Sequence, residues 1–216
     1  MSTPCFLTNR DLMAVVGMVE HLKKCADVGQ ITVIDCDSTY QPLLDWYASQ
    51  RDVTVIRTEN RGPQALWQLA QPIEDYFASD ADLDISGVPT DFLVKLRAKL
   101  QEPHWKKVGL SLRLDDIPDA HPFAAEVKAH EAQFWRRTNG PDWLIGLIDT
   151  TAAMYRGRSG WNGYGPAVRS AWPYCARHLL WYLTPGNVPE DWQHYLNRLS
   201  PKGVHWSPKL RDALGL

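Results

Sequence analysis

The sequence predicts an α/β fold, with a mixed and mostly parallel central sheet that carries helices on both faces. Strand-like and helix-like segments alternate through residues 1–85. Polar clusters follow the ends of the strand-like segments. The chain has 216 residues, 44% of them hydrophobic, which is enough for one sizeable core and short for two. We therefore expect a single domain over residues 1–216.

The first half of the chain shows the clearest alternation. Short apolar or β-branched runs predict strands at residues 5–8, 30–39, 52–58 and from 76 onward. Apolar residues at helical spacing predict helices at residues 12–23, 42–50 and 64–73, and the second of these has proline in its first turn. Crossover chirality then places the carboxyl ends of the strands at one edge of the sheet.

The second half is less regular. It predicts helices at residues 91–100 and 122–136, a strand at 107–114, and one or two strands within 142–156. A loop rich in glycine, arginine and aromatic residues follows at 156–166. Residues 174–183 show a helical pattern that contains His178. We find no internal repeat and no linker between two domains.

Composition excludes several classes of protein. The net charge of −2 gives no reason to expect nucleic acid as the main partner. Four scattered cysteines indicate reduced, mostly buried thiols and a cytoplasmic, reducing compartment. The first residues do not resemble a secretory signal, and no apolar run approaches the roughly 18 residues of a membrane span. Tryptophan is unusually frequent; residues such as Trp172 are expected mostly in the core, although tryptophan also offers a stacking surface.

Polar clusters lie just past four predicted strands. They are Asn9 with Arg10, Asp35 with Asp37, residues 58–61, and Asp80 with Asp82. Open α/β sheets bind their ligands at the carboxyl ends of the strands. Four clusters converging on one edge therefore favour a ligand site more strongly than any one of them alone.

The stretch YFASDADLD, residues 76–84, places three acids at alternate positions after a strand. Like charges this close repel, so a positive partner is expected nearby. Hard divalent cations such as Mn²⁺ or Mg²⁺ take carboxylates together with phosphate oxygens. The alternative is that Asp80 and Asp82 cap a turn or are solvated, because Asp-x-Asp is common by chance. Their position after the fourth strand favours the metal site.

The order of the motifs FLTNR, ITVIDCDST, VTVIRTENRGP and YFASDADLD resembles nucleotide-sugar-dependent glycosyltransferases of the GT-A fold. It is similar in particular to the small single-domain members of viruses and bacteria. The match covers residues 4–84, with weaker similarity in LIDTTAAMYR and ARHLLWY. The resemblance implies a Rossmann-like GT-A domain with a nucleotide-binding half at residues 1–85 and an acceptor-binding half at 86–216.

The resemblance also implies how the nucleoside is bound. Thr8, Asn9 and Arg10 match the residues that line the nucleoside pocket. An acid after the second strand would read the base. VIDCDST departs from the commoner Asp-Asp-Gly-Ser pattern, so Asp35 and Asp37 both stay candidates. UDP is the favoured nucleotide of the donor, because it is the commonest in similar enzymes.

The resemblance further implies which residues lie around the diphosphate of the donor. The segment beside the nucleotide is matched by Arg57, Asn60 and Arg61. Asp80 and Asp82 match the motif that binds metal and ribose, which implies Mn²⁺ or Mg²⁺ as cofactor. His178 matches a late histidine that completes the metal or diphosphate site. On the residues alone, a core or surface role is the favoured explanation of a single histidine on such a helix.

Asp115 and Asp116 follow a strand in the middle of the chain. An inverting transferase needs one carboxylate to deprotonate the acceptor hydroxyl, and either residue could serve, with Asp116 preferred. The alternative is a helix cap or a turn before Pro118. Inversion is preferred over retention because the most similar enzymes invert and because these acids offer a base.

The loop at residues 156–166 offers further candidates. Arg158 could bind the diphosphate and Trp161 could stack on a sugar face. The alternative is an ordinary flexible surface loop.

The sequence is compatible with three functions. The first is transfer of a sugar from a nucleoside diphosphate to a hydroxyl of a glycan acceptor, by this chain alone or as one part of a larger multidomain glycosyltransferase. The second is a nucleotidyltransferase acting on sugar phosphates, disfavoured because no glycine-rich loop follows the first strand. The third is a non-catalytic carbohydrate-binding module, suggested by the tryptophans. We favour the first.

Overall fold

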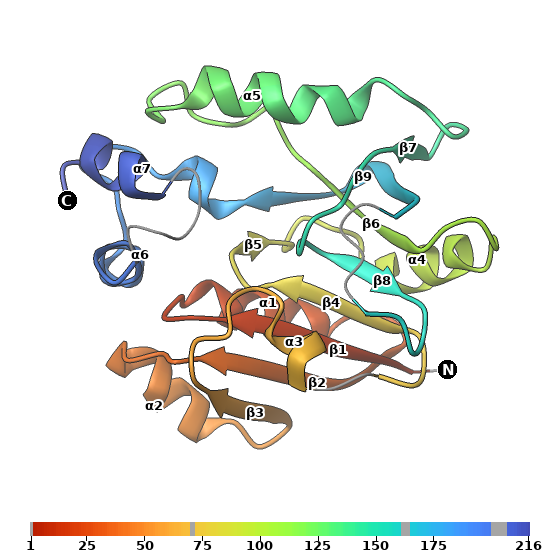
Figure 1. Cartoon of the computed structure of the whole chain (residues 1–216), viewed down its shortest axis with the longest axis horizontal. Coiled ribbons are helices and arrows are strands. Elements are labelled where there is room, and N and C mark those ends of the chain that lie inside the picture. The colour runs from red at the N-terminus through yellow and green to blue at the C-terminus, as the bar shows by residue number, and fades with distance from the viewer. Residues whose placement is uncertain (1, 70–71, 161–164, 200–206) are drawn as a thin grey trace.

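The computed structural model describes residues 2–69, 72–160, 165–199 and 207–216 (Figure 1). The elements of the first half are β1 (Thr3–Asn9), α1 (Ala14–Leu22), β2 (Val28–Cys36), α2 (Gln41–Ser49), β3 (Val53–Thr58), α3 (Ala65–Leu69), β4 (Tyr76–Asp80), β5 (Leu83–Asp84) and α4 (Phe92–Leu100). Those of the second half are β6 (Lys107–Leu112), α5 (Ala124–Ala132), η1 (Gln133–Trp135), β7 (Trp143–Ile145), β8 (Ala153–Tyr155), β9 (Ala167–His178), η2 (Leu179–Tyr182), α6 (Glu190–Asn197) and α7 (Ser207–Leu214).

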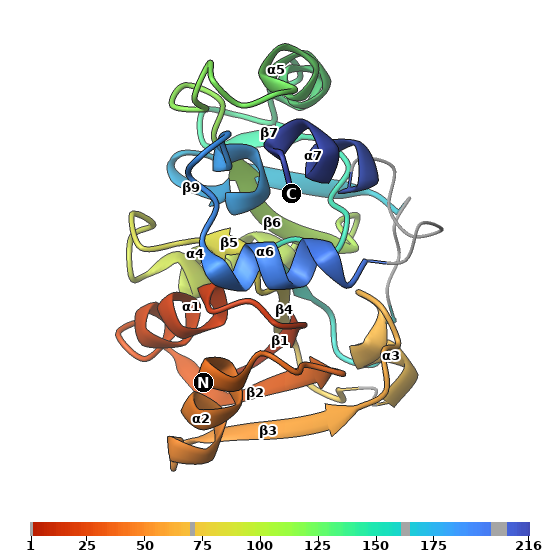
Figure 2. The same cartoon turned by 90° about the vertical axis from the view of Figure 1, so that its left-hand side faces the viewer.

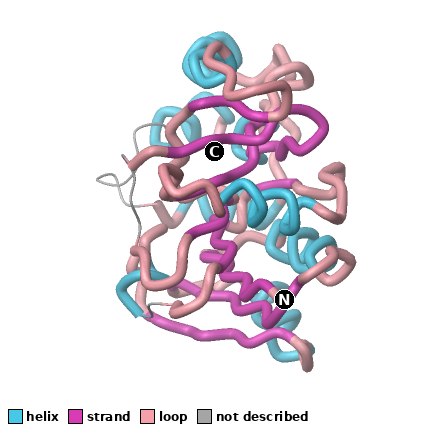
Figure 3. The backbone as a smooth tube through the Cα atoms, turned by 90° about the vertical axis from the view of Figure 1, so that its right-hand side faces the viewer, coloured by secondary structure: helices cyan, strands magenta, loops and turns pink. Residues whose placement is uncertain are grey.

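The strands form one mixed sheet in the order β3-β2-β1-β4-β8-β6-β9-β5, and β7 pairs with β9. β1, β2, β3 and β4 are mutually parallel, and β8 joins β4 to β6 by antiparallel pairing on both sides. β9 then runs parallel to β6. The strands cross the molecule as one layer (Figure 3). The predicted mixed and mostly parallel α/β fold is confirmed.

Strand alternation divides the core between the two faces of the sheet. On one face, Leu7 and Phe77 pack in the cluster that holds the apolar residues of α1, α2 and α4. On the other face, Ile34 and Ala78 pack with Leu66 of α3. Burying each large apolar side chain contributes roughly 1.5–3 kcal/mol, so both faces need a covering layer.

The carboxyl ends of β1 to β4, β6 and β9 meet at one edge, on the left of Figure 1. The chain leaves β1 for β2 on one side and returns to β4 on the other, so the order of strands reverses at β1. Such a switch point opens a crevice for ligands. Helix α6 lies across these strand ends (Figure 2).

Three sequence expectations need correction. The helix expected over residues 64–73 is described over Ala65–Leu69 and does not include residues 72–73, while residues 70–71 lie outside the described ranges. The helical pattern at 174–183 is wrong, because β9 continues to His178 before the short η2 turn. Backbone pairing of Ala176 with Leu112 and of His178 with Leu83 overrides the local periodicity. Trp172 is 64% exposed and is not a core residue.

Other expectations agree with the structure. All four cysteines are buried and free. None of the helices in the described ranges has the length and apolar character needed to cross a membrane.

Gly109 of β6 permits a close approach of the chain that leads into β8. A Cβ atom at this position would lie 2.5 Å from the carbonyl oxygen of Ala152 and 2.8 Å from Cδ1 of Ile148. We predict that Gly109→Ala lowers the free energy of unfolding by about 1–3 kcal/mol, because backbone must move to relieve the overlap. Urea denaturation measures this change.

Gly17→Ala in α1 is the matched control, because an added Cβ would meet no described atom within 4 Å. Alanine in a helix should stabilise by up to about 1 kcal/mol. Equal effects of the two substitutions would contradict the close approach of β6 and Ala152.

Candidate active site

Asp11 is a buried carboxylate just past the end of β1, in the left-handed backbone region at φ +61°. Its Oδ1 accepts hydrogen bonds from the backbone N–H groups of Thr39 and Tyr40, at 2.6 and 3.1 Å. Its Oδ2 pairs with the guanidinium of Arg198, which follows α6. Asp11 is not among the site residues predicted from the sequence, where the signal for it is an acid directly after Asn9 and Arg10.

Asn9 and Asp35 lie side by side in the register of β1 and β2. Asn9 Nδ2 donates to the hydroxyl of Tyr47 at 2.9 Å, and Arg57 Nε donates to Asp35 Oδ2 at 3.1 Å. Asn9 Oδ1 and Asp35 Oδ1 are buried, and neither has a hydrogen-bond partner among the described residues. Buried acceptors without donors are uncommon and need an explanation. A donor from a ligand or an ordered water would satisfy them.

Asp37 and Arg10 lie at the rim of this crevice. Asp37 is exposed, and its carboxylate lies 3.2 Å from Nη2 of Arg198. Arg10 donates through Nη2 to the Arg198 carbonyl at 3.4 Å, and its buried Nε has no hydrogen-bond partner in the described structure. Of the two candidate acids, Asp35 lies within β2 beside Asn9, whereas Asp37 follows the strand.

Asp80 ends β4, in register with Thr8 of β1. Burial raises the pKa of this carboxyl well above its usual range, and the charges of Asp82 and Asp149 add to the shift. The hydroxyl of Thr150 donates to Asp80 Oδ2 and offsets part of it. Tyr195 of α6 faces the same charges: burial, followed by Asp82 and Asp80, raises its pKa to about 12.

His178 lies beside Asp82, because β5 pairs with the end of β9. Its Nε2 is 3.4 Å from Asp82 Oδ2, and its ring stacks on Trp181 with centroids 4.8 Å apart. The other polar atom of each side chain, Asp82 Oδ1 and His178 Nδ1, is buried and lacks a partner in the described residues.

Asp116 lies in the turn that follows β6, and it contacts Arg177 of β9. Its Oδ2 accepts from Arg177 Nε at 2.6 Å and lies 3.1 Å from Arg113 Nη2. Its Oδ1 accepts from the Tyr182 hydroxyl at 2.5 Å. Asp115, by contrast, is exposed and forms a two-pronged ion pair with Arg113. Of the two candidate bases, Asp116 is therefore the one held by side chains from β9 and η2.

Arg177 also joins Asp116 to the acidic run. Its Nη1 lies 3.1 Å from Asp84 Oδ2, and the backbone N–H of Ser86 donates to Asp84 Oδ1. Although burial acts to raise the pKa of Asp84, these hydrogen bonds outweigh it and the pKa is lowered. Asp80 and Asp84 thus differ in environment: hydrogen bonds outweigh the cost of burying the charge at Asp84 but not at Asp80.

Asp80 and Asp82 could hold a divalent cation only together with ligand atoms from outside the protein, such as phosphate and water oxygens. In the parts of the chain that are described, no three His, Cys, Asp or Glu side chains form a ready-made metal cluster. The unpartnered Asp82 Oδ1 and the raised pKa of Asp80 are the features that a cation would relieve. Mg²⁺ and Mn²⁺ commonly bind one or two carboxylates and complete their shell with phosphate and water oxygens.

Other candidates are not brought to this cluster. Asn60 and Arg61 form local bonds in the turn after β3, to Gly62 and to Thr58 and Glu59. Arg158 follows the far end of β8, and its N–H donates to the Pro72 carbonyl before β4. Because β8 runs antiparallel to β4, this places Arg158 at the opposite edge of the sheet. Trp161 lies outside the described residues.

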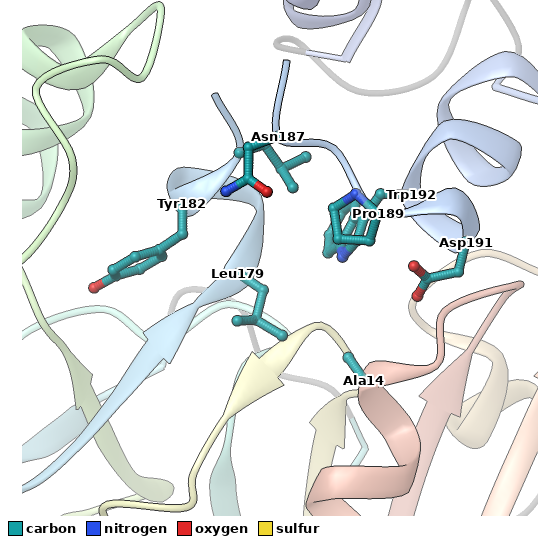
Figure 4. A pocket seen from close by; sticks show the side chains of 8 residues that line it. Ala14, Leu179, Tyr182, Asn187, Pro189, Asp191 and Trp192 are labelled. Carbon is teal, nitrogen blue, oxygen red and sulfur yellow. The ribbon is translucent and has the colours of Figure 1, made fainter. Parts of the chain in front are cut away.

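A cavity of about 300 Å³ lies beside η2 and α6. It lies between the start of α1, η2 and the start of α6 (Figure 4). Tyr182 lines it and reaches Asp116, while the N–H of Leu179, another lining residue, bonds to the Asp82 carbonyl. Two of the lining residues therefore link the cavity to Asp116 and Asp82, although neither acid lines it.

We predict that Asp11→Ala lowers the free energy of unfolding by about 2–4 kcal/mol, because two backbone donors and a guanidinium lose a buried acceptor. Asp37→Ala is the matched control, since it removes the exposed partner of the same arginine. Its cost should stay below about 1 kcal/mol. Urea denaturation of both variants measures the difference, and equal costs would contradict the role assigned to Asp11.

Comparison with known proteins leaves the family open. No family model matches the chain, and no curated protein matches it. Its structure is similar to that of S. aureus TarS residues 1–349, with a TM-score of 0.44, 15% identity, and coverage of 72% of this chain and 47% of that chain. For CMP:2-keto-3-deoxy-manno-octonic acid synthetase complexed with CTP, the TM-score is 0.41 at 9% identity, covering 100% of this chain and 83% of that chain. This chain spans about half of the TarS structure, and likenesses this weak carry no argument about function.

Proposed function

We propose that this protein is a metal-dependent glycosyltransferase that moves a sugar from a nucleoside diphosphate, with UDP favoured, to a hydroxyl of a glycan acceptor. One observation carries the proposal. The unpartnered acceptors of Asn9 and Asp35, the acids Asp80 and Asp82, and the carboxylate of Asp116 all lie along the carboxyl edge of one sheet.

The first half of the edge suits a nucleotide. A base N–H would satisfy the buried oxygens of Asn9 and Asp35. Asp80 and Asp82 would hold Mn²⁺ or Mg²⁺, with His178 beside them. When bound, such a cation neutralises the charge that develops on a diphosphate leaving group.

The second half of the edge suits the acceptor. Asp116 would take the proton of the acceptor hydroxyl as its oxygen attacks the anomeric carbon in line. The bond from that carbon to the diphosphate breaks, and the diphosphate leaves with the electron pair. Arg177 and Tyr182 hold the two oxygens of Asp116 in place. This single displacement inverts the anomeric configuration.

We predict that UDP binds in the presence of Mn²⁺ and at least about tenfold more weakly in EDTA. Asp82→Asn should abolish this metal effect, because it removes the carboxylate with the unpartnered oxygen. Calorimetric titration of UDP, GDP and CDP measures the affinities and identifies the base.

Asp119→Asn is the matched control, since the side chain of Asp119 is 98% exposed on another loop. Absence of binding by all three nucleotides would defeat the proposal. Release of pyrophosphate from a nucleoside triphosphate and a sugar phosphate would favour a nucleotidyltransferase instead.

We also predict that Asp80→Asn raises the melting temperature in EDTA by roughly 2–4 °C at neutral pH, about 1 kcal/mol for a chain of this size. A carboxyl whose pKa is raised on folding destabilises the folded state once pH passes its unfolded pKa. The gain should therefore shrink towards acid pH. Calorimetric scans with and without Mn²⁺ and UDP test this, and a lower melting temperature in EDTA would contradict it.

A further inference from the structure

Trp172 is a large aromatic residue left in solvent, with 64% of its surface exposed. It lies in β9 where the register with β6 shifts, between the pairs Leu110–Ser170 and Ser111–Cys175. The residues between these pairs have no partner in β6, so the strand bulges there. Trp172 therefore lies outside the β6–β9 pairing, and β9 continues beyond it to the candidate site.

Arg113 connects Trp172 to the candidate base. Its guanidinium carbon lies 5.1 Å from the centroid of the Trp172 ring, and its Nη2 lies 3.1 Å from Asp116 Oδ2. One side chain therefore spans the distance between the exposed ring and the carboxylate. The ring stays well exposed even though the guanidinium packs against it.

The surroundings of the ring favour a sugar over an apolar partner. Arg113 packs against the ring and is itself paired with Asp115, so a charged hydrogen-bonding group lies beside the ring. The other large apolar side chains that are exposed in the described structure lie in other elements or loops: Ile56, Leu69, Ile73, Val94 and Leu147. A flat aromatic face with polar groups at its edge matches a sugar ring, which offers C–H groups on its face and hydroxyls at its rim.

We infer that Trp172 is the platform on which a sugar ring of the acceptor stacks, with Arg113 placing that ring next to Asp116. The inference rests on the proposed function and names the acceptor as a carbohydrate recognised through its face. It also makes β9 the element that serves acceptor and donor together, since His178 ends the same strand.

Glycan-array binding of the full chain tests the inference, with wild type, Trp172→Phe, Trp172→Leu and Ile73→Ala compared at matched concentrations. Ile73 is the control, because it is 72% exposed and apolar but lies before β4. Trp172→Leu should weaken binding to the best glycan by about tenfold or more, which corresponds to about 1.4 kcal/mol. Trp172→Phe should retain most of the binding because it keeps an aromatic face, and Ile73→Ala should match wild type.

UDP titration of the same variants separates this inference from the proposed function. Unchanged UDP affinity in Trp172→Leu, together with lost glycan binding, supports the inference. Wild type that binds UDP but no glycan overturns it and leaves the proposed donor site intact. Glycan binding through Trp172 without any nucleotide binding would keep the subsite and overturn the transferase. Equal glycan binding by Trp172→Leu and wild type, or Trp172-dependent binding to phosphatidylcholine vesicles, would also overturn the inference.

Discussion

The buried carboxylate of Asp11 is the contact on which the rest of the site depends. A buried charge without partners is costly, so the chain must deliver donors to it. The loop after β2 supplies two backbone N–H groups, and Arg198 supplies a guanidinium from 187 residues away. Pairing with Arg198 fixes α6 over the strand ends. The same helix carries Asp191, which accepts from the backbone N–H of Met13 before α1.

The acids of residues 80–84 show how one fold treats like charges differently. Asp84 receives Arg177 and a backbone donor, and its pKa falls. Asp82 faces His178. Among the described residues, Asp80 accepts a side-chain hydrogen bond only from the Thr150 hydroxyl. Burial and the neighbouring charge of Asp82 outweigh it, so the pKa of Asp80 rises. Of these acids, Asp80 is therefore the one whose charged form is least favourable, and it lies at the switch point of the sheet. A cation and a diphosphate bound there would stabilise that charge.

β9 joins the two halves of the edge. Its parallel pairing with β6 brings Arg177 to Asp116, and its antiparallel pairing with β5 brings His178 to Asp82. The register shift in the middle of the strand frees Trp172. A single strand therefore positions residues that would serve the metal, the base and the acceptor, although the acids they meet come from other parts of the chain.

The sequence by itself determined the alternation of strands and helices, the edge at which the strands end, and the acids that gather there, because burial periodicity and strand ends are local patterns. It could not show that Asp11 is fully buried, that His178 ends a strand, or that Trp172 is exposed. It also could not separate Asp35 from Asp37, or place Arg158 at the far edge. Each of these depends on pairing between segments distant in the chain, such as Arg177 with Asp84 across 93 residues. Only the tertiary structure decides those pairings, because local sequence patterns do not specify which strands become neighbours in the sheet.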